Sequence, residues 1–566
     1  MKRNQLLNLF KRLIPCISCL PLLAALPLPP IQIQGIEGDV LLNVQRRLTP
    51  LLVTHTPLTE ITIKRQVTKA MAPYGFFTPH IRLMPHKKPI VLALDIIPGP
   101  LLRITTFHFQ LTGEGAHDPL LIQTKQALPL RPTMPFTTPN YEKAKEMMTN
   151  AALTKGYLHG AFKLTTVRID NARHTADIRW TFDTGPQYYF GQLQFDPTYL
   201  SPALLHRYVP FAKGEPYAPA NVATLNTNLT ASGYFSSVNV TPLITTKDIV
   251  PINVHLQPTQ RVSYTIGAGY GTDTGPRGVA GLHIIPVNRV GHTFNAIAQG
   301  SFAENALLAQ YIIPGGNPVI NHFNISGGVT NLHYNSGNSN AVLLGVAQSH
   351  VLPTFQRILS INDLHERYHY TGFNKQSTSL IYPKALFSWN DASDPLFSPS
   401  GYNVTLTGLA ASKAIVSRLN MAEFTLDAKA AFTLSTIRTR LYLHAIQGAI
   451  ITPNIYQVPL SLAQLLGGAP NLKGYDFNSI GPGKYMRYGG LELQKETKTK
   501  WYLLGFLDAG SVSNPLSNTL QYDAGIGLMW ISPIGPIKVA VAQPIQSVGQ
   551  QSRRSPKLVV NMGPDL

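Results

Sequence analysis

The second half of the chain alternates apolar and polar residues with a period of two, and this alternation restricts the possible fold more than any other feature. In RVSYTIGAGYGT (261–272), one face carries valine, tyrosine, isoleucine and alanine, while the other carries serine, threonine and glycine. GYNVTLTGL (401–409), YDAGIGLMW (522–530) and KLVVNMGPDL (557–566) repeat the pattern. Such runs, with aromatic ends and Gly, Pro or Asn turns between them, are typical of transmembrane β-barrels. Residues 260–566 leave room for roughly 16 strands of about 10 residues each.

Composition agrees with a barrel that faces lipid. Charged residues make up 13% of the 566 residues, and hydrophobic residues make up 44%. This is little charge for a soluble protein of this size. After residue 30, no run of 18 apolar residues occurs, which argues against transmembrane helices. A large soluble β-sandwich is the alternative, and it fits less well with the export signal described next.

The first 30 residues have a basic start followed by an apolar stretch broken by prolines. We predict a signal peptide at 1–28 with cleavage near Ala25. A membrane anchor, or a lipoprotein modified at Cys19, is the alternative. Cys16 and Cys19 are the two cysteines of the sequence, so residues 29–566 contain no thiol and no disulfide.

The net charge of +19 does not by itself identify a partner. The basic residues are scattered, without a basic run or a nucleic-acid-binding motif. We therefore expect no nucleic acid, and an anionic lipid surface or a barrel lumen as the counterpart of the charge.

The first half contains an internal repeat. Each copy ends a helical pattern at a glycine and then opens a strand at an aromatic residue: PYGFF (73–77), TKGYL (154–158) and ASGYF (231–235). Eight and four residues before each glycine lie residues that share one helical face: Val67 and Met71, Met148 and Ala152, Leu225 and Leu229. The glycine itself suits a left-handed C-cap. Each copy is therefore predicted to fold as strand, helix, helix, strand, strand. We place the α+β domains at 29–100, 101–186 and 187–259, and the barrel at 260–566.

These features together resemble the outer-membrane assembly factors that carry POTRA domains. The α+β copies are similar to POTRA domains, although an unrelated α+β repeat is the alternative for this half. LKGYDFNSIGPG (472–483) resembles the (V/L)-R-G-(F/Y) signature of a loop in these barrels, and GFLDAG (505–510) resembles their F-x-D-x-G strand. DPLFSPSGY (394–402) is similar to an element in the middle of the barrel. The resemblance implies three POTRA-like domains followed by a 16-stranded antiparallel transmembrane barrel in the outer membrane, with the N-terminal domains in the periplasm.

The same resemblance implies site residues in the loop. Its motif falls on Lys473, Gly474 and Tyr475, with lysine where the family has arginine. Lysine offers a point charge on a flexible stem rather than a planar fork. The loop is expected to enter the lumen and pair Lys473 with Asp508, with Glu492 as the second candidate. A solvated Lys473 at the loop tip is the alternative.

The first and last strands are expected to meet at a weak seam that can open. The first strand contains three glycines, and the last contains a glycine and a proline before the terminal leucine: Gly267, Gly269, Gly271, Gly563, Pro564 and Leu566. Glycine weakens a strand interior, and proline cannot donate to the ladder. The alternative is that these glycines only relieve crowding in the lumen.

One motif suggests an enzyme. HERYH (365–369) matches the zinc-protease pattern, but that pattern needs a helix, and the neighbouring residues indicate strand and turn. In a strand, Glu366 would point away from both histidines. We expect no catalysis, and no metal, nucleotide or redox cofactor.

Three POTRA-like units favour the TamA type of the translocation and assembly module over the BamA type. The resemblance then implies insertion of autotransporters or other β-barrel clients, with a TamB-like inner-membrane-anchored partner and contact with outer-membrane lipid. A two-partner-secretion pore that exports one cognate polypeptide is the alternative, and a passive porin fits least.

Overall fold

The computed structural model describes residues 31–53, 59–85, 92–245, 248–394, 396–515, 519–533, 535–546 and 555–563. The predicted signal peptide, Pro564 and Leu566 lie outside these residues. The chain forms two compact units. The first comprises Met1–Gln192, Phe211–Asn221 and Pro242–Ile252, and the second comprises the remaining residues up to Leu566.

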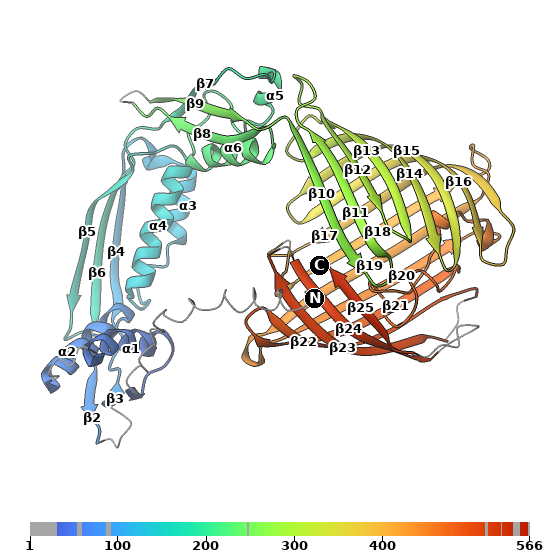
Figure 1. Ribbon diagram of the computed structural model, residues 1–566. Coiled ribbons are helices and arrows are strands. Elements are labelled where there is room, and N and C mark those ends of the chain that lie inside the picture. The colour runs from blue at the N-terminus through green and yellow to red at the C-terminus, as the bar shows by residue number, and fades with distance from the viewer. Residues whose placement is uncertain are drawn as a thin grey trace, which may run out of the picture. The chain divides into compact units, whose positions relative to one another are not determined.

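Three successive α+β modules precede the barrel in the sequence (Figure 1). The first contains β1 (Ile31–Gln34), α1 (Gly38–Val53), α2 (Glu60–Met71), β2 (His80–Leu83) and β3 (Leu92–Ile97). The second contains β4 (Arg103–Thr112), α3 (Pro119–Ala127), α4 (Thr138–Thr154), β5 (Ala161–Asp170) and β6 (Thr175–Asp183). The third contains β7 (Tyr189–Phe195), α5 (Pro202–His206), α6 (Pro219–Ala231), β8 (Phe235–Pro242) and β9 (Ile249–Pro258). The predicted order of strand, helix, helix, strand, strand is confirmed in each.

The three sheets share one topology. Their strand orders are β1-β3-β2, β4-β6-β5 and β7-β9-β8, so the last strand of each module lies in the middle. In the first two modules the opening strand runs parallel to this central strand, and the other neighbour runs antiparallel.

The repeat pattern in the sequence corresponds to buried helix faces and left-handed turns. All six of the residues predicted to share a helix face are buried: Val67, Met71, Met148, Ala152, Leu225 and Leu229. The predicted glycines have φ values of 91°, 85° and 74° at Gly75, Gly156 and Gly233. An added Cβ at Gly75 or Gly156 would also lie 2.7 Å or 2.5 Å from a carbonyl oxygen, so both positions require glycine.

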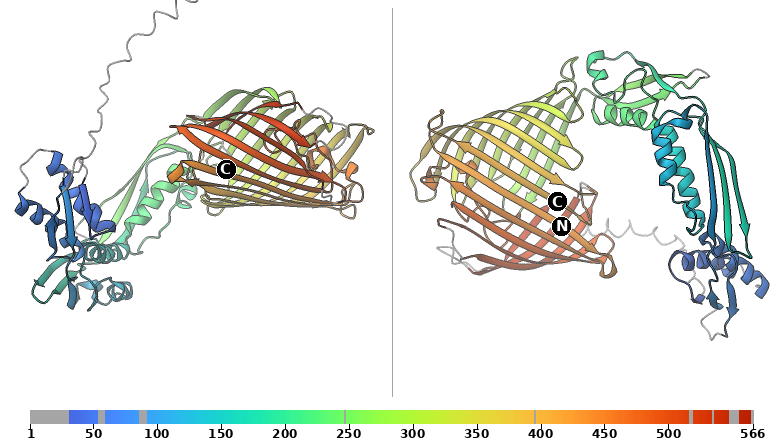
Figure 2. Two further views of the ribbon diagram at one scale, coloured as in Figure 1. Left: turned by 90° about the horizontal axis from the view of Figure 1, so that it is seen from below. Right: turned by 180° about the vertical axis from the view of Figure 1, so that it is seen from behind.

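The second half forms one antiparallel sheet of 16 strands in sequence order, which confirms the predicted barrel (Figure 2). The first eight strands are β10 (Val262–Gly271), β11 (Gly275–Ile284), β12 (Thr293–Gly300), β13 (Glu304–Pro314), β14 (Asn321–Tyr334), β15 (Gly337–Leu352), β16 (Phe355–Tyr370) and β17 (Gln376–Asn390). The last eight are β18 (Gly401–Ala411), β19 (Met421–Leu434), β20 (Thr439–Ile451), β21 (Tyr485–Lys498), β22 (Trp501–Ser513), β23 (Gln521–Ser532), β24 (Gly535–Gln546) and β25 (Lys557–Met562).

The two faces of this sheet differ in chemistry. Alternate residues carry exposed apolar side chains, such as Tyr264 and Ile266 on β10, which are 76% and 89% exposed. The residues that alternate with them along the strands face the interior, and they include the buried charged residues Glu366, Arg440 and Asp508. A sheet that closes around polar side chains and shows apolar ones outside is the arrangement of a lipid-embedded barrel.

Among the residues that the structure describes, no helix has both the length and the apolar character needed to cross a membrane.

Candidate functional site

The long connection between β20 and β21, residues 452–484, is the centre of the candidate site, and we call it the luminal loop. It contains two short 3₁₀ turns, η4 (Ile455–Gln457) and η5 (Leu460–Leu462). Ser461 donates to the Glu366 carboxylate on β16, and Gly474 donates to Asp523 on β23. Because the loop contacts inward side chains of strands far apart in the sheet, it lies inside the barrel.

Glycines let the loop fold back on itself. Gly467, Gly468 and Gly481 have φ values of 117°, 100° and 120°, a range that side chains rarely adopt. An added Cβ at Gly467 would lie 2.2 Å from the carbonyl oxygen of Asp476, so glycine is required there. Leu466 and Ile480 form an isolated bridge that closes the fold-back.

The loop motif is anchored by the predicted carboxylate. Lys473 Nζ lies 2.8 Å from Asp508 Oδ2 on β22, with the two side chains 15% and 1% exposed. Tyr488 on β21 donates to the other oxygen of Asp508 at 2.8 Å. The ammonium also lies 4.5 Å from the centre of the Phe506 ring, a favourable cation–π distance. The structure thus brings Lys473 and Asp508 together as expected, rather than leaving Lys473 solvated.

The other two motif residues are held by β23. Gly474 N–H donates to Asp523 Oδ2 at 2.8 Å, and an added Cβ would lie 2.9 Å from Asp523 Cβ. The Tyr475 hydroxyl donates to the carbonyl oxygen of Tyr522 at 3.2 Å. The backbone of the motif therefore sits too close to β23 for a side chain at position 474.

Glu492 has a different partner from the one expected. Its carboxylate lies 2.7 Å from Lys538 Nζ on β24 and accepts from Gln494 at 2.6 Å. The second carboxylate that contacts the loop motif is Asp523, which accepts from Gly474 N–H, and not Glu492. Glu492, Lys538 and Lys473 nevertheless line one luminal cavity of about 400 Å³.

The tip of the loop reaches both ends of the sheet. Ala469 N–H donates to Asp273, in the turn between β10 and β11, at 2.5 Å. Burial raises the pKa of this Asp273 carboxyl. Asp476 forms an ion pair with Lys557 of β25 and accepts from Asn335 at 3.0 Å. Loop residues therefore bind the first hairpin and the last strand together.

The seam between β10 and β25 is weakly joined. These strands are the two ends of the sheet order, and they are neighbours in space. Within the described residues, the hydrogen bond between them comes from Val560 N–H to the Thr272 hydroxyl at 3.2 Å, just beyond the end of β10. No β10–β25 register occurs in this part of the chain, so the edge of β10 is free of a ladder partner.

Of the glycines expected at the seam, Gly267, Gly269 and Gly271 lie in β10. An added Cβ would lie 3.9 Å from its nearest neighbour at Gly267 and 3.8 Å at Gly269, so crowding does not require glycine there. The expectation for Gly563 needs correction: β25 ends at Met562, and Gly563 follows it with a φ of 127°. Pro564 and Leu566 lie outside the described residues.

The HERYH segment lies in β16, as expected for a strand. His365 and His369 share one face, and Glu366 lies on the other, where it accepts hydrogen bonds from Ser339 and Ser461. This geometry cannot place both histidines and the glutamate around one ion.

Comparison with known proteins agrees with this architecture. A family model described as the Omp85 superfamily domain matches residues 326–563. The chain carries an Omp85 superfamily domain. A second model, for POTRA (surface antigen variable number repeat), matches residues 188–259, the third α+β module.

The fold is shared with a solved structure. BamA from Haemophilus ducreyi lacking POTRA domains 1–3 has a TM-score of 0.65 at 16% identity, covering 81% of this chain and 98% of that one. CdiB from Acinetobacter baumannii has a TM-score of 0.48 at 11% identity, covering 93% of this chain and 99% of that one. The Omp85 barrel lies in the outer membrane, and the N-terminal POTRA domains lie in the periplasm.

We expect the Asp476–Lys557 pair to hold the seam. Both side chains are partly exposed, so the pair is worth about 0.2–1 kcal/mol, and D476A should raise the opening of the seam up to about fivefold. The measurement is the rate of maleimide labelling of V560C, which is the single cysteine of residues 29–566 in this variant. K484A, in the same loop, is the control. If D476A leaves the labelling rate unchanged, the Asp476–Lys557 pair does not hold the seam closed.

Proposed function

We propose that this protein is a TamA-like assembly factor of the outer membrane. It would insert autotransporters or other β-barrel proteins, aided by a TamB-like partner anchored in the inner membrane. The proposal includes no cofactor and no catalysis. In this proposal, the three N-terminal domains are residues 29–100, 101–186 and 187–259. Lys473 and Asp508 anchor the luminal loop, and the seam between β10 and β25 opens for a client.

The observation that carries the proposal is the edge of β10, which has no ladder partner among the described residues, beside β25 of 6 residues. Lipid cannot satisfy free backbone N–H and C=O groups, so such an edge favours pairing with another strand. An incoming client strand can add to β10 by backbone hydrogen bonds, as in β-augmentation. The BamA barrel shares this fold, and three α+β modules support the TamA type.

The luminal loop supports assembly over export through the lumen. Its contacts with β16, β22 and β23 hold it across the interior. A pore for one cognate polypeptide would have to displace this loop, whereas strand addition at the seam leaves it in place.

Affinity capture of the tagged full-length protein from crosslinked membranes tests the proposal. We expect a large TamB-like partner and barrel clients among the captured proteins. Capture of one secreted exoprotein, with no effect of deletion of the gene on other outer-membrane proteins, would favour the secretion pore instead.

Deletions of the N-terminal modules should have unequal effects. Removing 31–186 is expected to weaken partner recruitment, whereas removing 187–258 should abolish function in a folded barrel. In the second unit, Arg207 donates to the Gly315 carbonyl at 2.8 Å, and Tyr234 donates to the Gly291 carbonyl, so the third module contacts barrel turns. Client assembly and partner capture are the two readouts, and equal mild defects would count against this division of roles.

A further inference from the structure

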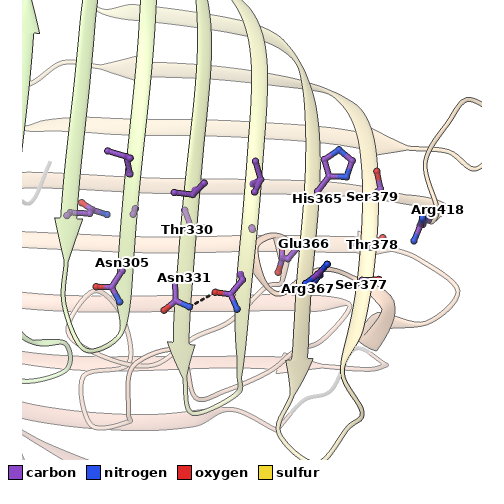
Figure 3. Close-up of a pocket in the computed structure, with 17 residues that line it drawn as sticks. Asn305, Thr330, Asn331, His365, Glu366, Arg367, Ser377, Thr378, Ser379 and Arg418 are labelled. Carbon is purple, nitrogen blue, oxygen red and sulfur yellow. Dashed lines mark hydrogen bonds between the residues drawn. The ribbon is translucent and has the colours of Figure 1, made fainter.

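A cavity of about 810 Å³ with a mixed polar and apolar lining lies on the lipid-facing side of β13–β17 (Figure 3). Side-chain alternation fixes its face: Glu366 points inward to the luminal loop, so His365 and Arg367 on either side of it point outward. The cavity lies near the β14–β15 and β16–β17 turns, at the end of the barrel away from the start of β10. In the outer membrane this end faces the outer leaflet.

Register places a polar row at the border of the apolar surface. Directly opposed residues across five strands form this row: Asn305, Asn331, Asn340, Arg367 and Ser377. The next outward row contains Leu307, Val329, Val342, His365 and Ser379. The apolar surface thus changes to hydrogen-bond donors and positive charge within two rows, which is the chemistry of the headgroup level.

The loop between β18 and β19 adds a second guanidinium. Arg418 N–H donates to the Ser379 carbonyl at 3.0 Å, and Ser417 bonds both backbone groups of Ile381. These bonds seat the loop on β17 and bring Arg418 into the cavity lining. In the same loop, Ile415 and Val416 are 75% and 65% exposed, so apolar side chains accompany the charge.

The positive charge of the cavity lacks an internal counterion. Within the described residues, neither Arg367 nor Arg418 forms an ion pair. Two acidic groups lie near them, and both have other partners. Glu366 points inward and accepts hydrogen bonds from Ser339 and Ser461, and Asp363 Oδ1 lies 3.2 Å from His365 Nε2. A charged side chain on the lipid face is costly at the bilayer midplane and much less so near the interface. An anion supplied from the lipid headgroups would compensate the two guanidiniums.

An apolar groove of about 1030 Å³ lies on the same face toward the other end of these strands. One outward row, which contains Leu344, Asp363 and Ile381, separates the groove from the cavity. Its outward lining includes Phe323, Ile325, Val346, Leu359, Ile361 and Pro383. Ile361 is four residues from His365 on β16, about 13 Å at the usual rise of a strand. A headgroup site and an acyl-chain groove therefore lie in line along one face.

We propose that this face binds a phosphorylated lipid of the outer leaflet, with its phosphate between Arg367 and Arg418 and its acyl chains in the apolar groove. Guanidinium groups bind phosphate through two parallel N–H donors, and the neighbouring asparagine and serine side chains can satisfy further oxygens. The site is on the opposite surface of the sheet from the luminal loop, so it is independent of the proposed assembly function.

Binding of bisphosphorylated lipid A to the full-length protein in neutral detergent, followed by native mass spectrometry, tests this. We expect R367Q/R418Q to weaken binding at least about tenfold, because both charge-assisted contacts are lost. R418Q alone, in an exposed loop where it cannot disturb strand pairing, should weaken it about threefold. The matched control R289Q/R438Q removes two exposed arginines from turns at the other end of the barrel and should stay within about twofold.

Two further probes separate the sources of the phosphate. Dephosphorylated lipid A should bind at least about tenfold more weakly than the phosphorylated form, and millimolar inorganic phosphate should not displace the lipid. Equal binding of the two lipids, or equal losses in the test and control variants, would overturn the proposal. Displacement by inorganic phosphate would also overturn it, because the site would then recognise a free anion. A heat-modifiable gel shift checks that each variant is folded.

Discussion

Replacing Lys473 by methionine is expected to destabilise the barrel by about 3–5 kcal/mol and to slow client assembly at least about tenfold. Asp508 and Asp523 are directly opposed on β22 and β23, and both are buried. Lys473 pairs with Asp508, while Asp523 Oδ1 has no hydrogen-bond partner in the described part of the chain. Without the ammonium, two carboxylates face each other in a poorly hydrated site.

Urea unfolding of the protein in lipid vesicles, followed by tryptophan fluorescence, measures this change. D508N should also destabilise the protein, and K473M/D508N should cost less than the sum of the single changes, because removing both charges leaves neither one unpaired. Strict additivity in this cycle would rule out the pair as the anchor of the loop.

K473R restores the arginine that the resemblance implies and is the conservative variant. An arginine fork carries more donors than an ammonium and can reach the free oxygen of Asp523 as well as Asp508. We expect K473R to retain assembly activity and to match or exceed the stability of the natural protein. A loss equal to that of K473M would show that the site is shaped for lysine.

The architecture could be predicted because its signals are local and periodic. Glycines after a helical face predict α+β modules, and they occupy left-handed turns at Gly75, Gly156 and Gly233. Period-two alternation predicts the 16 strands, since it follows directly from strand geometry. Parity within GFLDAG also indicated Asp508, because its neighbours on the strand are apolar.

The remaining loop contacts depend on distances that a sequence does not contain. Asp523 had a usable signal, since it has the parity opposite to the apolar face of YDAGIGLMW, yet nothing local tells which inward carboxylate lies beside position 474. Glu492 also points inward, but it pairs with Lys538 on β24, whose Nζ lies 2.7 Å from Glu492 Oε1. The contact between Asp476 and Lys557 joins residues 81 positions apart, and it follows only from the path of the folded loop.

A disulfide across the seam is expected to stop client assembly. T272C combined in turn with V559C, V560C and N561C tests three registers around the hydrogen bond from Val560 to Thr272. Because Cys16 and Cys19 lie in the predicted signal peptide, no other thiol competes in residues 29–566. Oxidation would fix β25 beside β10 and deny a client strand the free edge, so assembly should slow at least about tenfold and recover on reduction.

The control disulfide A298C/L307C joins two directly opposed residues of β12 and β13, which are already paired. Since this link leaves the seam free, oxidation there should not change the rate of assembly. G267A/G269A gives an independent view of the same seam: alanine fits at both positions and removes backbone freedom of about 0.5–1 kcal/mol each. It should therefore stiffen β10 and slow client addition moderately without unfolding the barrel. Assembly at full rate with a confirmed seam disulfide would refute opening of the seam as a step of assembly, because a client strand cannot then enter between β10 and β25.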